Sequence, residues 1–147
     1  MTALDAVQPS YDLFLSHSSR LDPRAEEVLE VLAPGLSRHG LRVFWDRTEL
    51  APGEPLLPSI ERAIIRSKVG LLIVTTAALG SGWVELELEA MWRARHAGSM
   101  RLIALLLERG TDAPDGWQWD VIIDGSAAGA RATLTDRVAA AVRDLNL

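Results

Sequence analysis

Two runs of six residues without a polar or charged side chain most constrain how this chain folds. They are 69–74 and 102–107. A short apolar run bounded by polar segments is typical of a strand buried on both faces, as the central strands of parallel sheets are. We therefore expect an α/β fold in which helices cover both faces of a sheet.

Weaker signals supply the other elements of the fold. The expected elements, in chain order, are a strand at 11–15, a helix from 23 that Gly40 closes, a strand at 41–45, a helix at about 56–66, a strand at 69–74, a helix that runs through 97, a strand at 102–107, a strand at 121–123 and a helix at about 134–145. Strands that alternate with helices form parallel sheets with right-handed crossovers. The prediction is a doubly wound, mostly parallel five-stranded sheet of the flavodoxin-like type, in three layers.

Composition is consistent with one compact domain. We expect residues 1–10 to be a flexible leader and 11–147 a single domain, since 147 residues that are 48% hydrophobic suffice for one core. The absence of cysteine excludes disulfides and thiolate chemistry and fits the cytoplasm. A net charge of −5 argues against a nucleic-acid partner. No apolar run approaches the ~20 residues that cross a bilayer, so we expect no membrane segment.

Several motifs that define enzyme classes do not occur in the sequence. It lacks the glycine-rich phosphate loops of dinucleotide-binding and P-loop proteins and the Gly-x-Ser-x-Gly turn of α/β hydrolases. The three histidines have no metal-ligand spacing, so we expect no metal site. We expect His39 at the surface, and a hydrogen-bonding role for His17.

Ligands of doubly wound sheets bind beyond the carboxyl ends of the strands. The loops expected at that edge are 16–22, 46–55, 75–82 and 108–119. The helix that follows 75–82 begins at the same edge, and it carries Glu87.

The segment that contains Glu87 fits two interpretations. Residues 84–89 alternate apolar and acidic side chains as a half-buried strand does, but good helix formers continue to 97 and Gly98 then ends the segment, so we predict a helix. One side of this helix carries Glu85, Glu89, Arg93 and His96, and the other carries Trp83, Glu87, Ala90, Met91 and Ala94. A carboxylate on the apolar side is paired, protonated or at the floor of a cleft, or else lies at the edge of the apolar arc and reaches water.

A partly buried carboxylate beside a tryptophan suits chemistry at a sugar carbon. Loss of a leaving group from C1 of a ribose builds positive charge on the ring, which a fixed anion stabilises. The tryptophan offers a flat face for a base or a nicotinamide. These residues permit cleavage of an N-glycosidic bond but do not select it.

The chain resembles a TIR domain over nearly all of its length. Residues 11–19 resemble the first TIR box, and 43–46 with 50–53 resemble the second box and its BB loop. Trp83 and Glu87 match the Trp-x-x-x-Glu signature, whose glutamate is catalytic in the enzymatic members. The three motifs follow one another in the family's order at the ligand edge of the expected sheet. The resemblance implies cleavage of NAD+ to nicotinamide and to linear, cyclic or conjugated ADP-ribose.

The resemblance also implies roles for individual residues. Glu87 would be the catalytic carboxylate and Trp83 the aromatic wall. The other residues that would contact NAD+ are His17, Ser18 and Ser19, Asp46 at the ribose, and Leu56, where some relatives carry a phenylalanine. Four BB-loop residues would serve assembly: Leu50, Pro52, Gly53 and Glu54. NAD+ would be the substrate, with no cofactor and no metal.

Two other functions compete with NAD+ cleavage. Adaptor TIR domains only bind other TIR domains, and nucleoside deoxyribosyltransferases use a glutamate on a similar sheet. An acid on an apolar arc favours the enzyme over the adaptor, and the Trp-x-x-x-Glu spacing argues against the transferase. TIR enzymes of bacterial antiviral defence are commonly fused to a sensor or triggered by one. We therefore expect either an excised domain or a protein that a partner activates, with activity that rises on self-association.

Overall fold

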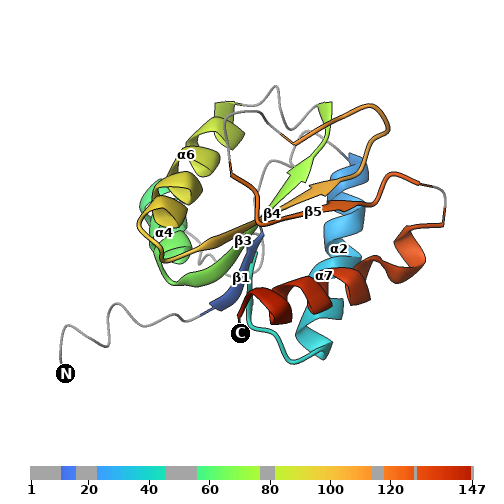
Figure 1. Ribbon diagram of the computed structural model, residues 1–147, viewed down its shortest axis with the longest axis horizontal. Coiled ribbons are helices and arrows are strands. Elements are labelled where there is room, and N and C mark those ends of the chain that lie inside the picture. Colours follow the sequence, from blue (N-terminus) through green and yellow to red (C-terminus); the bar gives the residue numbers. More distant parts are fainter. Residues whose placement is uncertain are drawn as a thin grey trace.

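The computed structural model describes residues 11–15, 23–45, 56–76, 82–113, 118–127 and 129–146, with backbone only at 24, 56–60, 82–87 and 131. A five-stranded sheet with the strand order β2-β1-β3-β4-β5 organises these residues (Figure 1). Its elements are β1 (Tyr11–Leu15), α2 (Pro23–Arg38), β2 (Val43–Phe44), α4 (Leu56–Ile65), β3 (Ser67–Val74), α6 (Gly82–His96), β4 (Arg101–Leu106), β5 (Val121–Asp124) and α7 (Arg131–Leu145). Every strand pair is parallel, which confirms the predicted architecture.

Helices cover both faces of the sheet, in three layers. Figure 1 shows α2 and α7 on one face and α4 and α6 on the other. The first face holds the larger cluster of buried apolar residues, in which Leu29 of α2 and Val138 of α7 pack against Leu71 of β3. On the second face, Ile64 of α4 and Met91 of α6 pack against Leu102 of β4.

Burial along β3 and β4 confirms that their two faces are equally enclosed. Val69, Leu71 and Ile73 belong to the core under α2 and α7, whereas Leu72 and Val74 belong to the opposite core. All five side chains are fully buried. An unbroken apolar run therefore forms a strand here because alternate side chains enter different cores.

Several element boundaries differ from the sequence prediction; β3, for example, begins at Ser67 and not at 69. Of the strand expected at 41–45, only Val43–Phe44 belong to a strand, β2. The Arg42 N–H donates to a carboxylate oxygen of Asp12 at 2.8 Å, so a side chain engages the backbone just before β2. Helix α7 begins at Arg131, one turn before the predicted position 134. Gly129, with φ of +81°, turns the chain just before the helix. The first residues of the helix lack an apolar stripe, so the sequence pattern did not reveal them.

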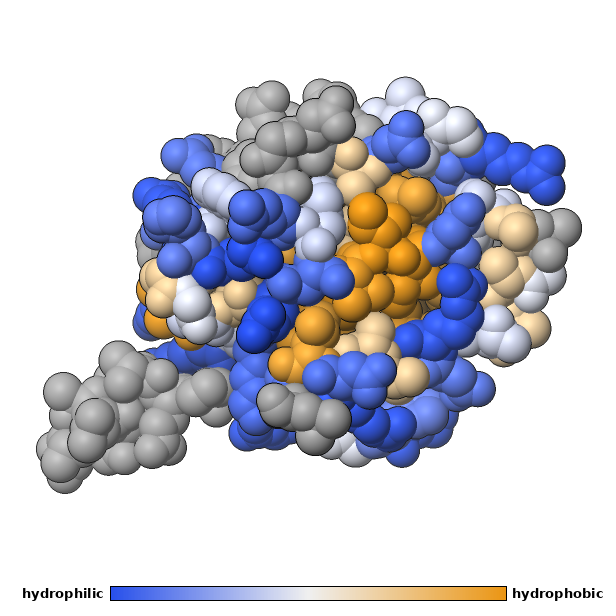
Figure 2. All heavy atoms as spheres, in the orientation of Figure 1, coloured by the Kyte–Doolittle hydropathy of each residue, from blue (hydrophilic) through white to orange (hydrophobic). Residues whose placement is uncertain are grey.

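The edge of the sheet at β5 exposes apolar surface. Ile122 of β5 is 55% exposed. Figure 2 shows hydrophobic atoms gathered at the centre of the same view, where Figure 1 places the sheet edge beside α7. Among the residues that the structure describes, no helix is both long and apolar enough to cross a membrane.

Helix α6 approaches the sheet closely at Gly70 of β3. A Cβ atom at residue 70 would lie 2.7 Å from Cε of Met91 and 2.8 Å from Sδ of Met100. Both methionines are buried, so neither end can move into water. The missing side chain of Gly70 thus makes the notch into which Met91 packs.

The notch predicts a coupled effect on stability. We expect Gly70→Val to reduce the free energy of unfolding by about 1–3 kcal/mol through overpacking. Met91→Ala alone should cost about 2–5 kcal/mol by leaving a cavity. The double variant should cost less than the sum by at least ~0.5 kcal/mol, because valine fills the vacated space. Urea denaturation measures all three values, and strict additivity would contradict the contact.

Candidate functional site

The sheet order identifies the point where a ligand of this fold binds. From β1 the chain passes to β2 on one side, then returns to β3 on the other side. The crevice of such a sheet opens beyond the carboxyl ends of the two strands between which the order reverses, here β1 and β3. Those strands end at Leu15 and Val74.

Most of the residues predicted to contact the ligand or to serve assembly lie outside the described residues. These are His17, Ser18, Ser19 and Asp46, together with the BB-loop residues Leu50, Pro52, Gly53 and Glu54. Three others are described by their backbone alone: Leu56 is the first residue of α4, and Trp83 and Glu87 lie in the first half of α6. The roles assigned to all of them stay predictions.

The backbone of α6 confirms the helical interpretation of 82–96. Met91 and Ala94 are buried, and Glu89, Arg93 and His96 are exposed, as the two predicted sides require. At about 100° per residue, position 87 falls on the helix arc between the directions of Met91 and Ala94. The backbone site of Glu87 therefore belongs to the arc that faces the sheet.

A carboxylate fixes the chain where it leaves β3. Thr76 donates its hydroxyl to Glu108 Oε2 at 2.8 Å and its backbone N–H to Glu108 Oε1 at 3.3 Å. Glu108 follows the end of β4, so this pair joins the carboxyl ends of two neighbouring strands. The sequence prediction placed Glu108 only in a long loop, and 32 residues separate the pair, so no local pattern could have identified it.

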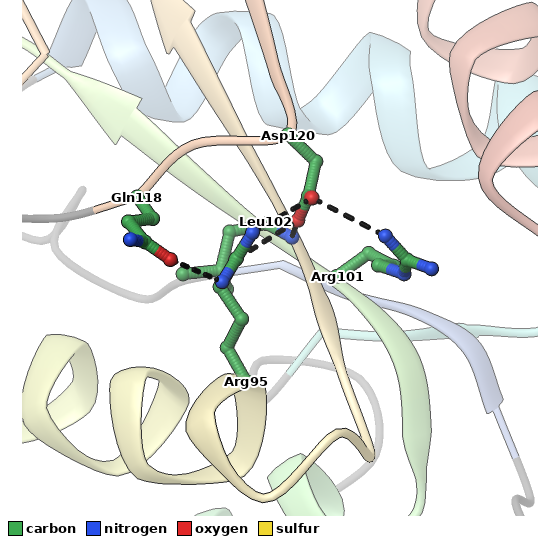
Figure 3. A network of polar contacts seen from close by, with 5 residues as sticks. All are labelled: Arg95, Arg101, Leu102, Gln118 and Asp120. Atoms are coloured by element: carbon green, nitrogen blue, oxygen red, sulfur yellow. Dashed lines mark hydrogen bonds and ion pairs between the residues drawn. The ribbon is translucent and has the colours of Figure 1, made fainter.

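The other end of α6 is fixed by an ion pair (Figure 3). Arg95 donates from Nη2 to Asp120 Oδ1 at 3.0 Å and from Nε to Oδ2 at 3.2 Å, the two-nitrogen geometry that binds carboxylates strongly. Its third nitrogen donates to Gln118 at 2.8 Å. The Leu102 N–H donates to Asp120 Oδ2 at 2.8 Å, which ties the carboxylate to the start of β4.

The pKa of Asp120 reflects these opposing effects. Burial of its side chain, which is only 9% exposed, acts to raise the pKa of the carboxyl. Hydrogen bonds from Arg95 and from the Leu102 N–H, with the charges of Arg95 and Arg101, outweigh burial and lower the pKa below its ordinary value. Asp120 is therefore ionised at neutral pH.

A third carboxylate, that of Asp124, shapes the turn after β5. Ser126 donates its hydroxyl at 2.5 Å and its backbone N–H at 2.9 Å to Asp124 Oδ1. These hydrogen bonds lower the pKa of Asp124, and the positive charges of Arg137 and Arg109 add to the effect. The arrangement closes a local turn on an exposed surface.

His39 and Trp119 have structural roles. His39 lies partly exposed between α2 and α7, where its Nε2 is 2.9 Å from Asp136 and its carbonyl accepts a hydrogen bond from Arg143. Trp119 packs against the buried residues under α6. Within the described ranges, no three acidic or histidine side chains are grouped to hold a metal ion.

Two hollows in the described surface lie away from the ligand edge. One, of about 330 Å³, lies between α4 and α6, and its lining includes Ala97 and Ser99, which follow the end of α6. The other, of about 90 Å³, lies between α2 and α7 and is lined by residues such as Val31 and Leu134. Neither is lined by residues at the carboxyl ends of the strands.

Comparisons with known proteins agree with this geometry. The family model described as "TIR domain" matches residues 13–137. The NAD(+) hydrolase PdTIR of Paracoccus denitrificans is 25% identical over 131 residues, which are 89% of this chain and 38% of the relative. The 2' cyclic ADP-D-ribose synthase AbTIR of Acinetobacter baumannii is 31% identical over 85 residues, or 58% of this chain and 30% of the relative. This chain thus spans well under half of the length of these curated relatives, 38% of the first and 30% of the second.

A solved structure supports the fold independently. The crystal structure of the TIR domain of the Toll-related receptor TRR-2 of Hydra magnipapillata matches with a TM-score of 0.68. The match covers 91% of this chain and 99% of that one, at 18% sequence identity. At this identity the likeness concerns the fold.

The ionised Asp120 predicts a dependence of stability on pH. Its pKa is lowered in the folded protein, so its contribution is complete above the unfolded value of about 4 and is lost as pH falls through the folded value. We expect Asp120→Asn to reduce the unfolding free energy at neutral pH. The difference in unfolding free energy between this variant and the wild type should become smaller at acidic pH. Urea midpoints measured from about pH 7 to pH 3 give the comparison. Asp112→Asn, at an exposed loop carboxylate, is the control, and a pH-independent gap would contradict this account.

Proposed function

The chain belongs to the TIR domain family, and on this basis we propose that it cleaves NAD+ at the bond between nicotinamide and ribose. The observation that carries the proposal is the place of the Trp-x-x-x-Glu signature. By helix geometry, position 87 of this signature falls on the sheet-facing arc of α6, the helix that follows β3 at the ligand edge. Relatives of this chain named as NAD(+) hydrolase and 2' cyclic ADP-D-ribose synthase support the same substrate.

In the proposed mechanism, the C1–N bond breaks and its electron pair leaves with nicotinamide, which departs neutral. Positive charge builds on the ribose ring, and the Glu87 carboxylate stabilises it and accepts hydrogen bonds from the ribose hydroxyls. Trp83 supplies a flat apolar face for the nicotinamide ring. No cofactor is required, because the ring nitrogen of NAD+ is already cationic and needs no proton to leave.

The remaining predicted residues bind the rest of the substrate. Ser18 and Ser19 would donate hydrogen bonds to the phosphates, and His17 lies beside them in sequence. Asp46 would accept from a ribose hydroxyl, and Leu56 would border the site. Attack of water on C1, with loss of a proton, yields ADP-ribose, whereas attack of a hydroxyl of the same molecule yields a cyclic product.

The proposal extends to cellular role and assembly. We propose that NAD+ depletion or an ADP-ribose signal serves bacterial antiviral defence in the cytoplasm, under the control of a sensor partner. Contacts between copies of the chain would raise activity. The exposed apolar edge at β5 supports association, because exposed strand edges readily pair with other chains.

Replacement of Glu87 tests the activity. We expect Glu87→Gln, which keeps the size but removes the charge, to lower kcat for nicotinamide release by about 10²–10⁴-fold. Glu89→Gln is the matched control, since this carboxylate lies two residues along the same helix and is exposed. Mass spectrometry of the products after incubation with NAD+ at high protein concentration measures both.

Three results distinguish the alternatives. Equal activity of the wild type and Glu87→Gln would contradict the catalytic role. Self-association without turnover by the wild type would favour an adaptor. Exchange of bases between nucleosides, without turnover of NAD+, would favour a deoxyribosyltransferase.

Assembly predicts a dependence on protein concentration. We expect the rate of NAD+ cleavage per protein molecule to rise with protein concentration. This rise should parallel the increase in average molar mass measured by light scattering. Ile122→Lys should weaken both rises, because it places a charge on the apolar edge. Val31→Lys is the control, at a residue of similar exposure on α2. A rate per molecule that is constant across dilution would contradict activation by assembly.

A further inference from the structure

Three positions of α6 lie one turn apart along the same row of the helix. They are Glu87, Met91 and Arg95. Four residues advance an α-helix by about 6 Å and rotate it by only about 40° beyond a full turn. Position 87 and Arg95 are therefore at nearly equal distances from Met91, on opposite sides of it.

Leu88 and Met91 both pack α6 against the sheet, and Met91 makes a close approach to it. Met91 is fully buried, and its Cε atom occupies the notch at Gly70 of β3. Apolar contacts hold the helix against the sheet, but they are not directional and leave its tilt weakly defined. A second, directional attachment is needed to set the tilt.

Arg95 provides this second attachment on the side away from Glu87. Its guanidinium holds both oxygens of Asp120, and Figure 3 shows the carboxylate between Arg95 and the start of β4. The backbone N–H of Leu102 fixes Asp120 to that strand. The side chains of Arg95 and Asp120 are only 22% and 9% exposed, so water competes little for either group.

We propose that the Arg95–Asp120 pair is a positioning device for Glu87, which sets the tilt of α6 about Met91. This inference rests on the proposed NAD+ cleavage and assigns a further residue to it. Because an α-helix is stiff over two turns, a displacement of α6 at Arg95 also displaces position 87, two turns away. A misplacement of about 1 Å at a catalytic group can cost as much as 10²-fold in rate.

The same carboxylate offers a matched control. Arg101 also contacts Asp120 Oδ1, at 3.5 Å, but its side chain is 60% exposed and belongs to β4. Loss of Arg101 removes a positive charge near Asp120 and leaves the attachment of α6 intact. Comparing variants of Arg95 and Arg101 therefore separates the effect of helix position on kcat from the effect of the charge near Asp120.

The test measures kcat and KM for NAD+ in the full chain, with thermal melting to confirm that each variant is folded at the assay temperature. We expect Arg95→Gln to lower kcat by about 10-fold or more with KM changed by less than about 3-fold, since the displaced group acts on the transition state. Arg95→Lys should recover part of the loss in kcat, because lysine keeps the positive charge but cannot donate from two nitrogens to the two oxygens of Asp120. Arg101→Gln should keep kcat within about 2-fold of the wild type.

Several results would overturn the inference. They are an unchanged kcat in folded Arg95→Gln, an equal loss in Arg101→Gln, and a change confined to KM. If Arg95→Gln does not fold, Asp120→Asn replaces it with the same expectation, since its amide oxygen can still accept from Leu102. Absence of turnover by the wild type would overturn the proposed function and this inference together, whereas wild-type turnover with equal losses in both arginine variants would overturn the inference alone.

Discussion

Burial of β3 and β4 on both faces is the constraint on which the rest of the structure depends. These strands have no side that could face water, so helices must cover each face and the chain must cross between faces as it proceeds. That crossing places the reversal of strand order at β1 and β3. The candidate site follows from the same constraint, because the crevice of a doubly wound sheet opens where the order reverses.

The helix that carries Glu87 has contacts along its whole length. Thr76 and Glu108 fix the chain where it leaves β3, Met91 enters the notch at Gly70, and Arg95 binds Asp120. Each contact joins α6 or its approach to a neighbouring part of the sheet. A general acid, base or electrostatic group is effective only when its position is fixed in advance, and this arrangement supplies that support from outside the site.

The sequence predicted the layers of the fold because they depend on local periodicity. The unbroken apolar run 69–74 and the stripe that contains Met91 each report burial directly. The start of α7 was predicted one turn late because its first residues carry no apolar stripe. The Asp120 pair and the Glu108 pair were not predicted, because they join residues 25 and 32 positions apart through tertiary contacts of polar side chains. For the site itself, helix propensity and the stop at Gly98 predicted the helix, and helical periodicity predicted the arc that carries position 87. The support of that helix became visible only in three dimensions.

The central claim is that the carboxylate of Glu87 meets the nicotinamide ribose of NAD+. The most direct measurement is a crystal structure of the Glu87→Gln variant with intact NAD+ bound. We expect the side-chain amide of residue 87 within about 3 Å of a hydroxyl of that ribose, with the nicotinamide ring beside Trp83. A nucleotide bound elsewhere, or a side chain at position 87 that points into bulk solvent with no hollow beside it, would contradict the account.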